Sequence, residues 1–380
     1  MRFFVRYMER MIIGYDAKRA FCNGTGLGNY SRGVIAGAVE SGEVEAVLYT
    51  PYAKSRYEHW TEGLPHTRVK MPQGWWKCEP SLWRTLAKAQ EVEEDGVQIY
   101  HGLSQELPLG LPKKTIKMVT VHDLIAWRYP QYFSPFDRAI YRKKMRYACR
   151  VADVVVAISE QTKQDLVELM EVPEEKIKVV YQTCDSMFWN MENENLNIEA
   201  AHEKYHLPDK YIVCVGTIEE RKNQLCAIRA IQRLPEEIGL VIVGRPRGKY
   251  GQEALREAND RIRIVTHADF ADFPAIYRGS LASVYISRFE GFGIPVLESM
   301  CCDTPVVTSG VSSMPEAGGE AALYANPDDD AAVAEHLLRL ATNEAFRQEC
   351  IEKGRIQKKR FAPERVAQDM IEVYRSFGTI

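Results

Sequence analysis

The chain has 380 residues, of which 46% are hydrophobic and 27% are charged, and these proportions are ordinary for globular domains. Its 49 Lys and Arg residues against 52 Asp and Glu residues give a formal charge of -3, which excludes the basic excess of a general nucleic-acid-binding protein. No apolar run approaches the roughly 18 residues that indicate a transmembrane helix, and the first residues do not have the pattern of a secretory signal.

Short apolar runs alternate with amphipathic segments along the chain, a pattern that predicts strands separated by helices. In the first half, the expected strands are 11–15, 45–50, 97–101, 116–121, 154–159 and 177–181, and the expected helices lie near 28–39, 80–92, 135–151 and 160–170. In the second half, the expected strands are 211–216, 240–244, 261–265, 282–286, 305–308 and 322–324. The expected helices there lie near 224–234, 251–257, 274–279, 295–301, 330–342, 344–360 and 364–377.

Several expected strands, such as 154–159 and 211–216, are apolar at consecutive positions, as strands covered on both faces are. The two series therefore predict an α/β protein with two doubly wound parallel sheets. The polar stretch 191–203 has little apolar periodicity and is the expected joint between the domains. Ligands of such sheets bind beyond the carboxyl ends of the strands, and with two domains the expected site is the cleft between them.

Neither the cysteines nor the acidic residues predict a metal site. The nine cysteines are scattered, odd in number and without a C-x-x-C pair, which favours buried thiols in a reducing cytoplasm over a disulfide scaffold or a zinc site. Asp328 and Asp330 form a D-x-D pattern, but they precede an Ala- and Leu-rich helix. We therefore expect them to cap that helix and complement its dipole.

The most informative segment is SRFEGFGIPVLESM, residues 287–300, which follows an apolar strand. Gly291 and Gly293 allow a ligand to approach the backbone closely, and the helix that starts after them has amides suited to a phosphate. Glu290 and Glu298 flank this turn, where two carboxylates can hold the hydroxyls of a sugar and of a ribose. The alternative is an ordinary strand–turn–helix junction in which Glu298 only complements the helix dipole.

This segment resembles the E-x7-E signature of retaining nucleotide-sugar glycosyltransferases with the GT-B fold, particularly glycosyltransferase family 4. Further segments resemble the family's motifs in the expected order: GTGLGNYSRG (24–33), TVHDL (120–124), VGTIEERKN (215–223) and TPVVTSGVSSMPEAGGEAAL (304–323). The resemblance covers most of the chain and implies two facing Rossmann-like domains with a deep cleft between them. It assigns the acceptor to 1–190, the nucleotide sugar to 191–362, and a crossing back to the first domain to the final helix, 363–380.

Arg221 and Lys222 follow the strand that ends at Gly216. Two cations at a strand end can neutralise the charge that develops on a departing diphosphate, with Arg as a bidentate ligand and Lys as a point charge. The alternative is a solvated loop in which Asn223 caps the next helix. The resemblance favours diphosphate binding, although many members carry Arg directly after the glycine, where this chain has Thr217.

His122 and Asp123 end an apolar strand, where a hydrogen-bonded structural histidine is the ordinary alternative. The resemblance implies that His122 faces the donor sugar near the reacting carbon, in a positioning role, with Asp123 to orient it. The glycine motif at 24–29 is an incomplete dinucleotide fingerprint, and no acidic residue ends the next strand, which counts against a nicotinamide enzyme. The resemblance places Gly26 and Gly28 in a loop near the donor phosphate and the acceptor; the alternative is a tight strand-to-helix turn.

The resemblance assigns the departing phosphate to Arg221, Lys222 and backbone amides, the sugar hydroxyls to Glu290, and the ribose to Glu298. The backbone positions expected to contact the donor are Gly216, Gly291, Phe292, Gly293 and Ile294. No enzyme nucleophile stands out, so we expect no covalent intermediate. Because GT-B enzymes generally need no metal, we expect neither a metal nor a cofactor.

The segment 136–152 predicts a basic amphipathic helix, with cations on one arc and apolar residues, Ile140 among them, on the other. The cations are Arg138, Arg142, Lys143, Arg146 and Arg150. Such a helix can contact anionic lipid headgroups or be the solvated face of an ordinary packed helix. The tryptophans Trp75, Trp76 and Trp83 suggest an acceptor-facing or lipid-facing element, with core packing as the alternative.

These observations predict a cytoplasmic retaining glycosyltransferase, and the basic helix adds contact with the inner face of the membrane as an expectation. It would move a sugar from GDP-mannose or a UDP-sugar to a glycan or a lipid-linked acceptor in surface polysaccharide or glycolipid assembly. The alternatives are another GT-B activity, such as a phosphorylase or an epimerase, or a non-catalytic nucleotide-sugar-binding protein. The base, the sugar, the acceptor and the linkage stay open.

Overall fold

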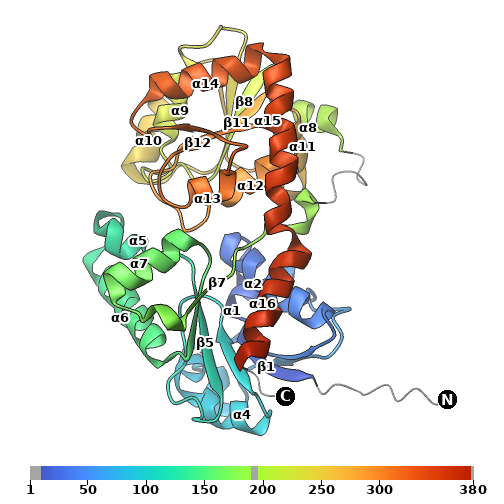
Figure 1. Ribbon diagram of the computed structural model, residues 1–380, viewed down its shortest axis with the longest axis vertical. Coiled ribbons are helices and arrows are strands. Elements are labelled where there is room, and N and C mark those ends of the chain that lie inside the picture. The colour runs from blue at the N-terminus through green and yellow to red at the C-terminus, as the bar shows by residue number, and fades with distance from the viewer. Residues whose placement is uncertain (1–9, 190–195, 378–380) are drawn as a thin grey trace, which may run out of the picture. The chain divides into compact units, whose positions relative to one another are not determined.

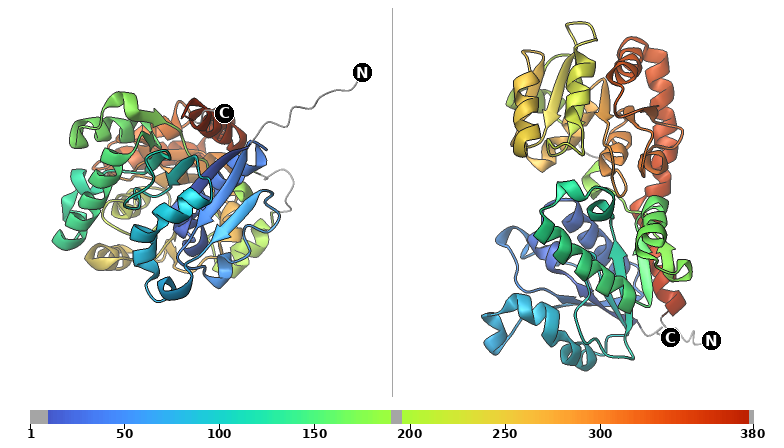
Figure 2. Two further views of the ribbon diagram at one scale, coloured as in Figure 1. Left: turned by 90° about the horizontal axis from the view of Figure 1, so that it is seen from below. Right: turned by 90° about the vertical axis from the view of Figure 1, so that its left-hand side faces the viewer.

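The computed structural model describes residues 10–189 and 196–377, which fold into two compact units. Unit 1 combines Met1–Thr183 with Pro363–Ile380, and unit 2 is Cys184–Ala362. The chain therefore enters unit 2 a few residues before the joint expected at 191. Figures 1 and 2 show each unit as strands flanked by helices.

Unit 1 holds a parallel sheet of seven strands in the order β3-β2-β1-β4-β5-β6-β7. The strands are β1 (Met11–Asp16), β2 (Val44–Tyr49), β3 (Thr67–Lys70), β4 (Ile99–Gly102), β5 (Ile116–Val121), β6 (Val154–Ala157) and β7 (Ile177–Val179). All of these were expected except β3. This short edge strand carries Arg68 and Lys70 and has no buried residue, so it lacks an apolar pattern.

The larger helices of unit 1 lie between these strands. They are α1 (Lys18–Cys22), α2 (Gly26–Glu40), α4 (Lys88–Glu94), α5 (Ile125–Arg128), α6 (Pro135–Val151) and α7 (Glu160–Met170). The helix expected at 80–92 is broken into α3 (Pro80–Leu82), a π-helical turn (Trp83–Ala87) and α4. Ser134 and Ser159 cap α6 and α7 by accepting the amides of Asp137 and Thr162, as N-cap serines do.

Unit 2 holds a parallel sheet of six strands in the order β10-β9-β8-β11-β12-β13. The strands are β8 (Tyr211–Val215), β9 (Gly239–Val243), β10 (Ile262–Val265), β11 (Ala282–Tyr285), β12 (Val306–Ser309) and β13 (Leu323–Ala325). The helices are α8 (Ile198–Tyr205), α9 (Gln224–Ile231), α10 (Gly248–Glu257), α11 (Phe273–Arg278), α12 (Ile294–Cys301), α13 (Met314–Gly318), α14 (Asp330–Thr342) and α15 (Glu344–Gln357).

Two of these helices lie where the sequence analysis expected none. Helix α8 begins inside the polar stretch 191–203 that was expected to join the domains, extends two residues beyond it, and buries Ala201 and Tyr205. Its two buried residues are too few to give a strong apolar period. Helix α13 has only five residues, which is shorter than any periodic pattern can indicate.

In both sheets the order reverses between two neighbouring strands, β1 and β4 in unit 1 and β8 and β11 in unit 2. Ligands of doubly wound sheets bind at the carboxyl ends of such strands. The topology therefore predicts ligand-binding residues in the loops after β8 and β11, and in those after β1, β4 and β5.

The last helix, α16 (Pro363–Phe377), belongs to unit 1 and packs on α2, as its dark red ribbon in Figures 1 and 2 shows. It buries Val366, Met370, Ile371 and Tyr374. Gly37 of α2 allows the close packing, because a Cβ there would lie 2.8 Å from the Cβ of Ala367. Within the described ranges, no helix combines the length and the apolar character that a bilayer span requires.

Candidate active site

The loop after β8 begins at Gly216, whose backbone requires glycine. Its φ is +136°, and an added Cβ would lie 2.8 Å from Nζ of Lys222. The glycine therefore lets the loop fold back so that the lysine approaches the end of the strand. The ammonium of Lys222 lies 5.5 Å from the centroid of the Tyr285 ring, within the range of a cation–π contact.

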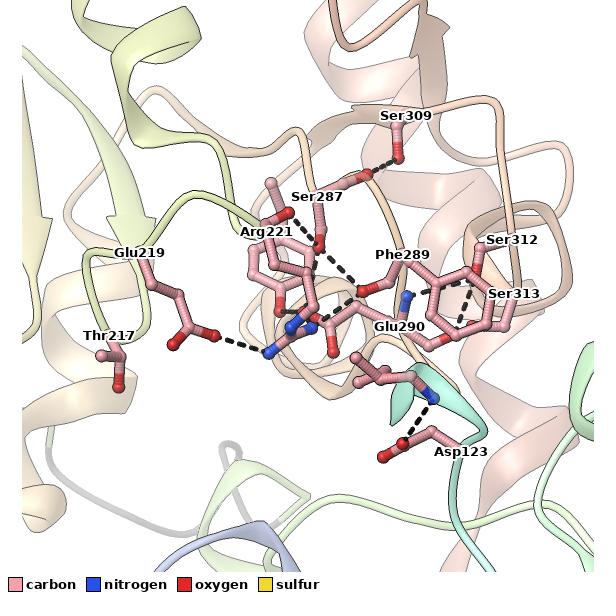
Figure 3. A network of polar contacts seen from close by, with 12 residues as sticks. Asp123, Thr217, Glu219, Arg221, Ser287, Phe289, Glu290, Ser309, Ser312 and Ser313 are labelled. Atoms are coloured by element: carbon pink, nitrogen blue, oxygen red, sulfur yellow. Dashed lines mark hydrogen bonds and ion pairs between the residues drawn. The ribbon is translucent and has the colours of Figure 1, made fainter. Parts of the chain in front are cut away.

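Arg221 and Glu290 form a half-buried ion pair at this switch point (Figure 3). Nη1 of Arg221 lies 2.5 Å from Oε1 of Glu290 and also donates to the carbonyl of Phe289 at 2.8 Å. Nη2 donates to Oε1 of Glu219 at 2.8 Å. Burial disfavours the charge of Arg221, but the nearby carboxylates outweigh it and raise its pKa.

Glu290 is fixed from several sides. The hydroxyls of Tyr285 and Ser287 donate to its Oε1 at 2.6 and 3.0 Å. Its backbone carbonyl accepts from Ser312 and Ser313 at 2.6 and 2.9 Å (Figure 3). Burial raises the pKa of Glu290, but the charges of Arg221 and Lys222 and these hydrogen bonds outweigh burial, so the pKa lies below its usual value.

All three side-chain contacts of Glu290 meet one oxygen, Oε1. Within the described residues, Oε2 has no hydrogen-bond partner. It is also not a fully buried atom, so a ligand can reach it. Similarly, no carboxylate of the described chain lies within ion-pair distance of Lys222. The site thus offers one carboxylate oxygen and one ammonium to a ligand.

Glu298 lies on α12 and is buried, with its Oε2 accepting the hydroxyl of Tyr277 at 3.1 Å. Burial raises its pKa to about 7, against smaller opposing contributions from Tyr277 and Lys222. The turn before α12 requires Gly293, whose φ is +102° and whose added Cβ would lie 2.6 Å from Cε of Met314.

The other turn residues expected at this site are close to the core. Gly291 and Phe292 are buried and Ile294 is half-buried at the start of α12. The Phe292 ring meets the ring of Phe361 edge to face, with centroids 5.1 Å apart. The turn is therefore held by apolar packing on one side and by Ser312 and Ser313 on the other.

Asn223 does not form the side-chain cap that the alternative interpretation of this loop requires. It occupies the N-cap position of α9 in the left-handed region, at φ 59°, and makes no side-chain cap hydrogen bond. Its amide instead donates to the carbonyl of Pro327 at 2.7 Å. The side chain instead ties the loop to a segment distant in sequence, which counts against the alternative in which Asn223 caps α9.

In unit 1, His122 follows β5 and is buried. Its Nε2 donates to the carbonyl of Leu103 at 2.9 Å, because a carbonyl oxygen can only accept. Burial lowers the pKa of His122 to about 4, so the ring is neutral at neutral pH and Nδ1 carries the lone pair. Asp123 accepts the amide of Ile125 at 3.0 Å and thereby starts α5.

The two glycines of the loop before α2 differ in their surroundings. A Cβ on Gly28 would lie 1.8 Å from the carbonyl oxygen of Asn23, so no other residue fits there. A Cβ on Gly26, the first residue of α2, would meet nothing within 4 Å. Gly28 is required by the turn itself, whereas Gly26 leaves open space at the helix start.

The side chains that orient the Arg221–Glu290 pair were not predicted from the sequence. Tyr285 and Ser287 come from the end of β11, Glu219 from the loop after β8, and Ser312 and Ser313 from the segment after β12. In the sequence, the only indication of their role is that they are polar residues at or after the ends of apolar strands.

Helix α6 differs from the two-arc expectation. Its buried residues are Met145, Ala148 and Cys149, whereas Ile140 is 41% exposed. Arg138 and Arg142 turn inward and donate to the carbonyls of Pro130 and Ala126. Both guanidinium groups are thus held by backbone oxygens of the segment that precedes α6.

A groove of about 1400 Å³ lies along α6, entirely within unit 1. Its cationic lining is Arg138, Arg142, Lys143, Lys144, Arg146, Arg150 and Lys176, against the carboxylates Glu106 and Glu171. Phe136, at the start of α6, is 73% exposed. Of the three tryptophans, Trp83 is fully buried in the core and Trp75 is 65% exposed.

The D-x-D segment is a helix start, as expected, but the residue that caps α14 is the intervening Asp329, which accepts the amide of Ala332. Asp328 pairs with Arg288 and Asp330 with Arg233. The described residues hold no group of three or more His, Cys, Asp or Glu side chains placed to bind a metal. All nine cysteines are free thiols.

Comparison with known proteins identifies the family. Residues 25–186 match the family model described as Glycosyltransferase Family 4, and residues 197–357 match the one described as Glycosyl transferases group 1. O-antigen chain mannosyltransferase B of Escherichia coli is 30% identical over 288 residues, which cover 73% of this chain and 74% of that protein. O-antigen chain mannosyltransferase RfbU of Salmonella typhimurium is 24% identical over 322 residues, 81% of this chain and 85% of that protein.

Among solved structures, Anabaena Alr3699/HepE in complex with UDP and glucose matches this chain with a TM-score of 0.75. The match has 16% sequence identity and covers 97% of this chain and 100% of that one, so it shows a shared fold. Two Rossmann-like units with parallel sheets, the two matching family models and the 30% identity to a mannosyltransferase lead to one conclusion. The chain belongs to glycosyltransferase family 4 and is a glycosyltransferase with the GT-B fold.

Proposed function

We propose that this glycosyltransferase moves mannose, with retention of configuration, from a nucleotide-diphosphate sugar to a glycan or lipid-linked acceptor in surface polysaccharide assembly. The observation that carries the proposal is the Lys222, Arg221 and Glu290 arrangement at the switch point of unit 2. The mannosyltransferases among its relatives support the choice of sugar. GDP-mannose is the expected donor, with UDP-sugars as the alternative.

In this proposal the leaving diphosphate is stabilised by fixed charge. Lys222 supplies an ammonium that no carboxylate of the described chain neutralises, and the start of α12 adds backbone amides beyond Gly293. Charges that are already in place need no reorganisation as the glycosidic bond to the phosphate breaks. Arg221 contributes through its remaining N–H groups while its Nη1 holds Glu290.

Two carboxylates have different tasks here. The lowered pKa keeps Glu290 ionised, so its Oε2 can accept a hydroxyl of the donor sugar while Oε1 stays with Arg221. Glu298 accepts the ribose hydroxyls from its buried position on α12. In unit 1, Nδ1 of the neutral His122 accepts a further sugar hydroxyl, which makes His122 a positioning group and not a general base.

The nucleobase has a candidate pocket within unit 2. A cavity of about 340 Å³ lies at the carboxyl ends of β9 and β10, lined by Gly244, Arg245, His267 and neighbouring residues. The Arg245 guanidinium lies 3.0 Å from Nδ1 of His267, so both side chains border the same space. A polar pocket at this edge of the sheet suits the base of a nucleotide whose diphosphate lies at the switch point.

For the acceptor side we propose contact with an anionic membrane surface at the cytoplasmic face. The groove along α6 combines cations with the exposed side chain of Ile140, and Phe136 is exposed at the start of the same helix. Cations beside exposed apolar side chains suit phospholipid headgroups. The test is sedimentation with phosphatidylglycerol and phosphatidylcholine vesicles. Binding only to the anionic vesicles, weakened by Lys143→Gln with Arg146→Gln, is expected; equal recovery with both vesicles contradicts this part of the proposal.

The transfer itself is tested with GDP-mannose and UDP-sugars against an extract of lipid-linked acceptors, in the presence and absence of EDTA. Mannose incorporation that survives chelation is expected, because side chains and amides neutralise the diphosphate. Complete loss restored by manganese or magnesium would contradict the metal-free mechanism. Sugar phosphate release from a glycan with inorganic phosphate would favour a phosphorylase, and tight nucleotide-sugar binding without turnover would favour a sensor.

A further inference from the structure

A chain of hydrogen bonds between uncharged groups runs through the interior of unit 1, from α16 toward His122. The Tyr374 hydroxyl lies 2.8 Å from Nδ1 of His101, and Nε2 of His101 lies 2.8 Å from Oγ1 of Thr120. Oγ1 of Thr120 lies 3.1 Å from the hydroxyl of Tyr30. The Tyr30 ring then meets the His122 ring edge to face, with centroids 4.6 Å apart.

These side chains are shielded from solvent and lie outside the donor contacts proposed above. His101, Thr120 and Tyr374 have no exposed area, and Tyr30 is 5% exposed. Burial lowers the pKa of His101 to about 3, so its ring is neutral. A neutral imidazole donates with one nitrogen and accepts with the other. The directions of the hydrogen bonds to Tyr374 and Thr120 are therefore coupled through His101.

The chain of contacts connects three elements that carry or adjoin the site. Thr120 lies on β5, two residues before His122, which follows the strand. Tyr30 lies on α2, one turn after Gly26. Tyr374 stands 273 residues from His101 in the sequence and comes from α16. Apolar residues already anchor α16, so burial alone does not explain a polar chain at this position. Buried hydrogen bonds of this kind instead restrict the arrangement of the groups that they join.

The helix that carries Tyr374 follows in the sequence directly after the last residues of unit 2. Phe361 ends a short helical turn of unit 2, and its ring packs on Phe292 of the glycine turn. Two residues later α16 begins within unit 1. A continuous stretch of the polypeptide thus contacts the turn that is expected to bind the diphosphate and then enters the series of hydrogen bonds that leads to His122.

We propose that Tyr374, His101, Thr120 and Tyr30 are positioning residues that hold the His122 ring with Nδ1 available to the donor sugar. The catalytic part of this inference rests on the proposed function of His122. Its structural part, that the Tyr374 hydroxyl sets the orientation of the His122 ring through the buried chain, stands on the geometry alone.

The first experiment compares Tyr374→Phe with Tyr49→Phe as a matched control. Tyr49 is also fully buried in unit 1 and donates one hydrogen bond, to Asp95 at 2.8 Å, outside the chain that reaches His122. Both variants lose a single buried hydroxyl. We expect Tyr374→Phe to lower kcat about tenfold without changing nucleotide affinity, whereas Tyr49→Phe leaves kcat unchanged. Equal effects of the two variants on kcat would overturn the inference.

A double-mutant cycle separates action through His122 from a general loss of stability. In a His122→Ala background, Tyr374→Phe is expected to cause no further loss of kcat. A full additional tenfold loss would overturn the positioning role. If His122→Ala alone leaves kcat unchanged, the proposed function of His122 fails, and the inference is then decided by spectroscopy.

That readout is the ¹⁵N resonances of the His122 ring in the ligand-free protein. The structure predicts a neutral ring with the proton on Nε2 in the unmodified chain. Tyr374→Phe should shift or broaden these resonances, and Tyr30→Phe should do the same, while Tyr49→Phe should not. Unchanged His122 resonances in both Tyr374→Phe and Tyr30→Phe would overturn the inference, whatever the kinetic result.

Discussion

The Arg221 region of unit 2 and the His122 region of unit 1 both lie at the carboxyl edge of a parallel sheet, but they are built from opposite kinds of groups. The first is organised by charge, with Arg221 between Glu219 and Glu290 and Lys222 beside them. The second is organised by uncharged hydrogen bonds around a neutral histidine.

In the proposed function, this difference corresponds to the two parts of a nucleotide sugar, with Glu290 as the one group of the charged region that is assigned to the sugar. A diphosphate gains most from fixed positive charge, whereas a sugar presents uncharged hydroxyls that need acceptors in set directions. The same topology thus supports two chemistries, because the residues that follow the strands decide the electrostatics and the strands only place them.

The strongest way to break the comparison is to remove the helix that supports the uncharged region. Deleting residues 363–380 removes four buried side chains of unit 1, each of which contributes about 1.5–3 kcal/mol. We expect transfer to be abolished, because the summed loss is comparable to the whole free energy of unfolding of a typical domain, about 5–15 kcal/mol. Unit 2 should still bind nucleotide. Turnover and nucleotide affinity of the truncated protein check this, and normal turnover would show that α16 is dispensable.

A smaller but more specific effect is expected from Glu290→Gln, which leaves the charge of Arg221 without its nearest partner. We expect kcat to fall on the order of 100-fold to 1000-fold and the free energy of unfolding to fall by about 3 kcal/mol. Glu219→Gln is the matched control, since Glu219 also pairs with Arg221 but is not proposed to touch the sugar. An equal fall in kcat for both variants would mean that Glu290 acts only by holding Arg221.

The smallest expected effect concerns Glu298, whose pKa is raised from 4.5 to about 7 by burial. The folded protein keeps a proton on Glu298 that the unfolded chain releases at lower pH. Stability from this group is therefore present below about pH 4.5 and declines as pH rises toward about 7. Glu298→Gln should remove this decline, as thermal unfolding across that range would measure. An identical pH dependence in the variant would contradict the buried, protonated state.

Much of the fold could be predicted, because consecutive apolar residues in strands such as β6 and β8 and clear periods in α14 and α16 reflect deep burial. What escaped prediction has a weak apolar pattern. Edge strand β3 has no buried residue, and α8 buries only two.

The candidate site divides in the same way. Glu290, Arg221 and Lys222 stand out as charged residues at strand ends, and the structure brings them together. The hydroxyls of Ser312 and Ser313 could not be found, because they act on a backbone carbonyl through a segment that is distant in sequence. Nor could the inward turn of Arg142 be predicted, because it depends on the carbonyl of Ala126, a residue of α5 that lies 16 positions earlier in the sequence.

The central claim is that the charged edge of unit 2 holds a nucleoside diphosphate, and calorimetry with Lys222→Ala tests it most directly. GDP, UDP and the bare nucleosides are titrated into the unmodified protein, the variant and Lys210→Ala, which removes an exposed charge just before β8, at the opposite edge of the same sheet. Loss of one charged hydrogen bond should weaken diphosphate binding by about 1.5–3 kcal/mol, leave nucleoside binding unchanged, and have no counterpart in Lys210→Ala. Equal weakening for diphosphate and nucleoside, or no weakening at all, would contradict the account.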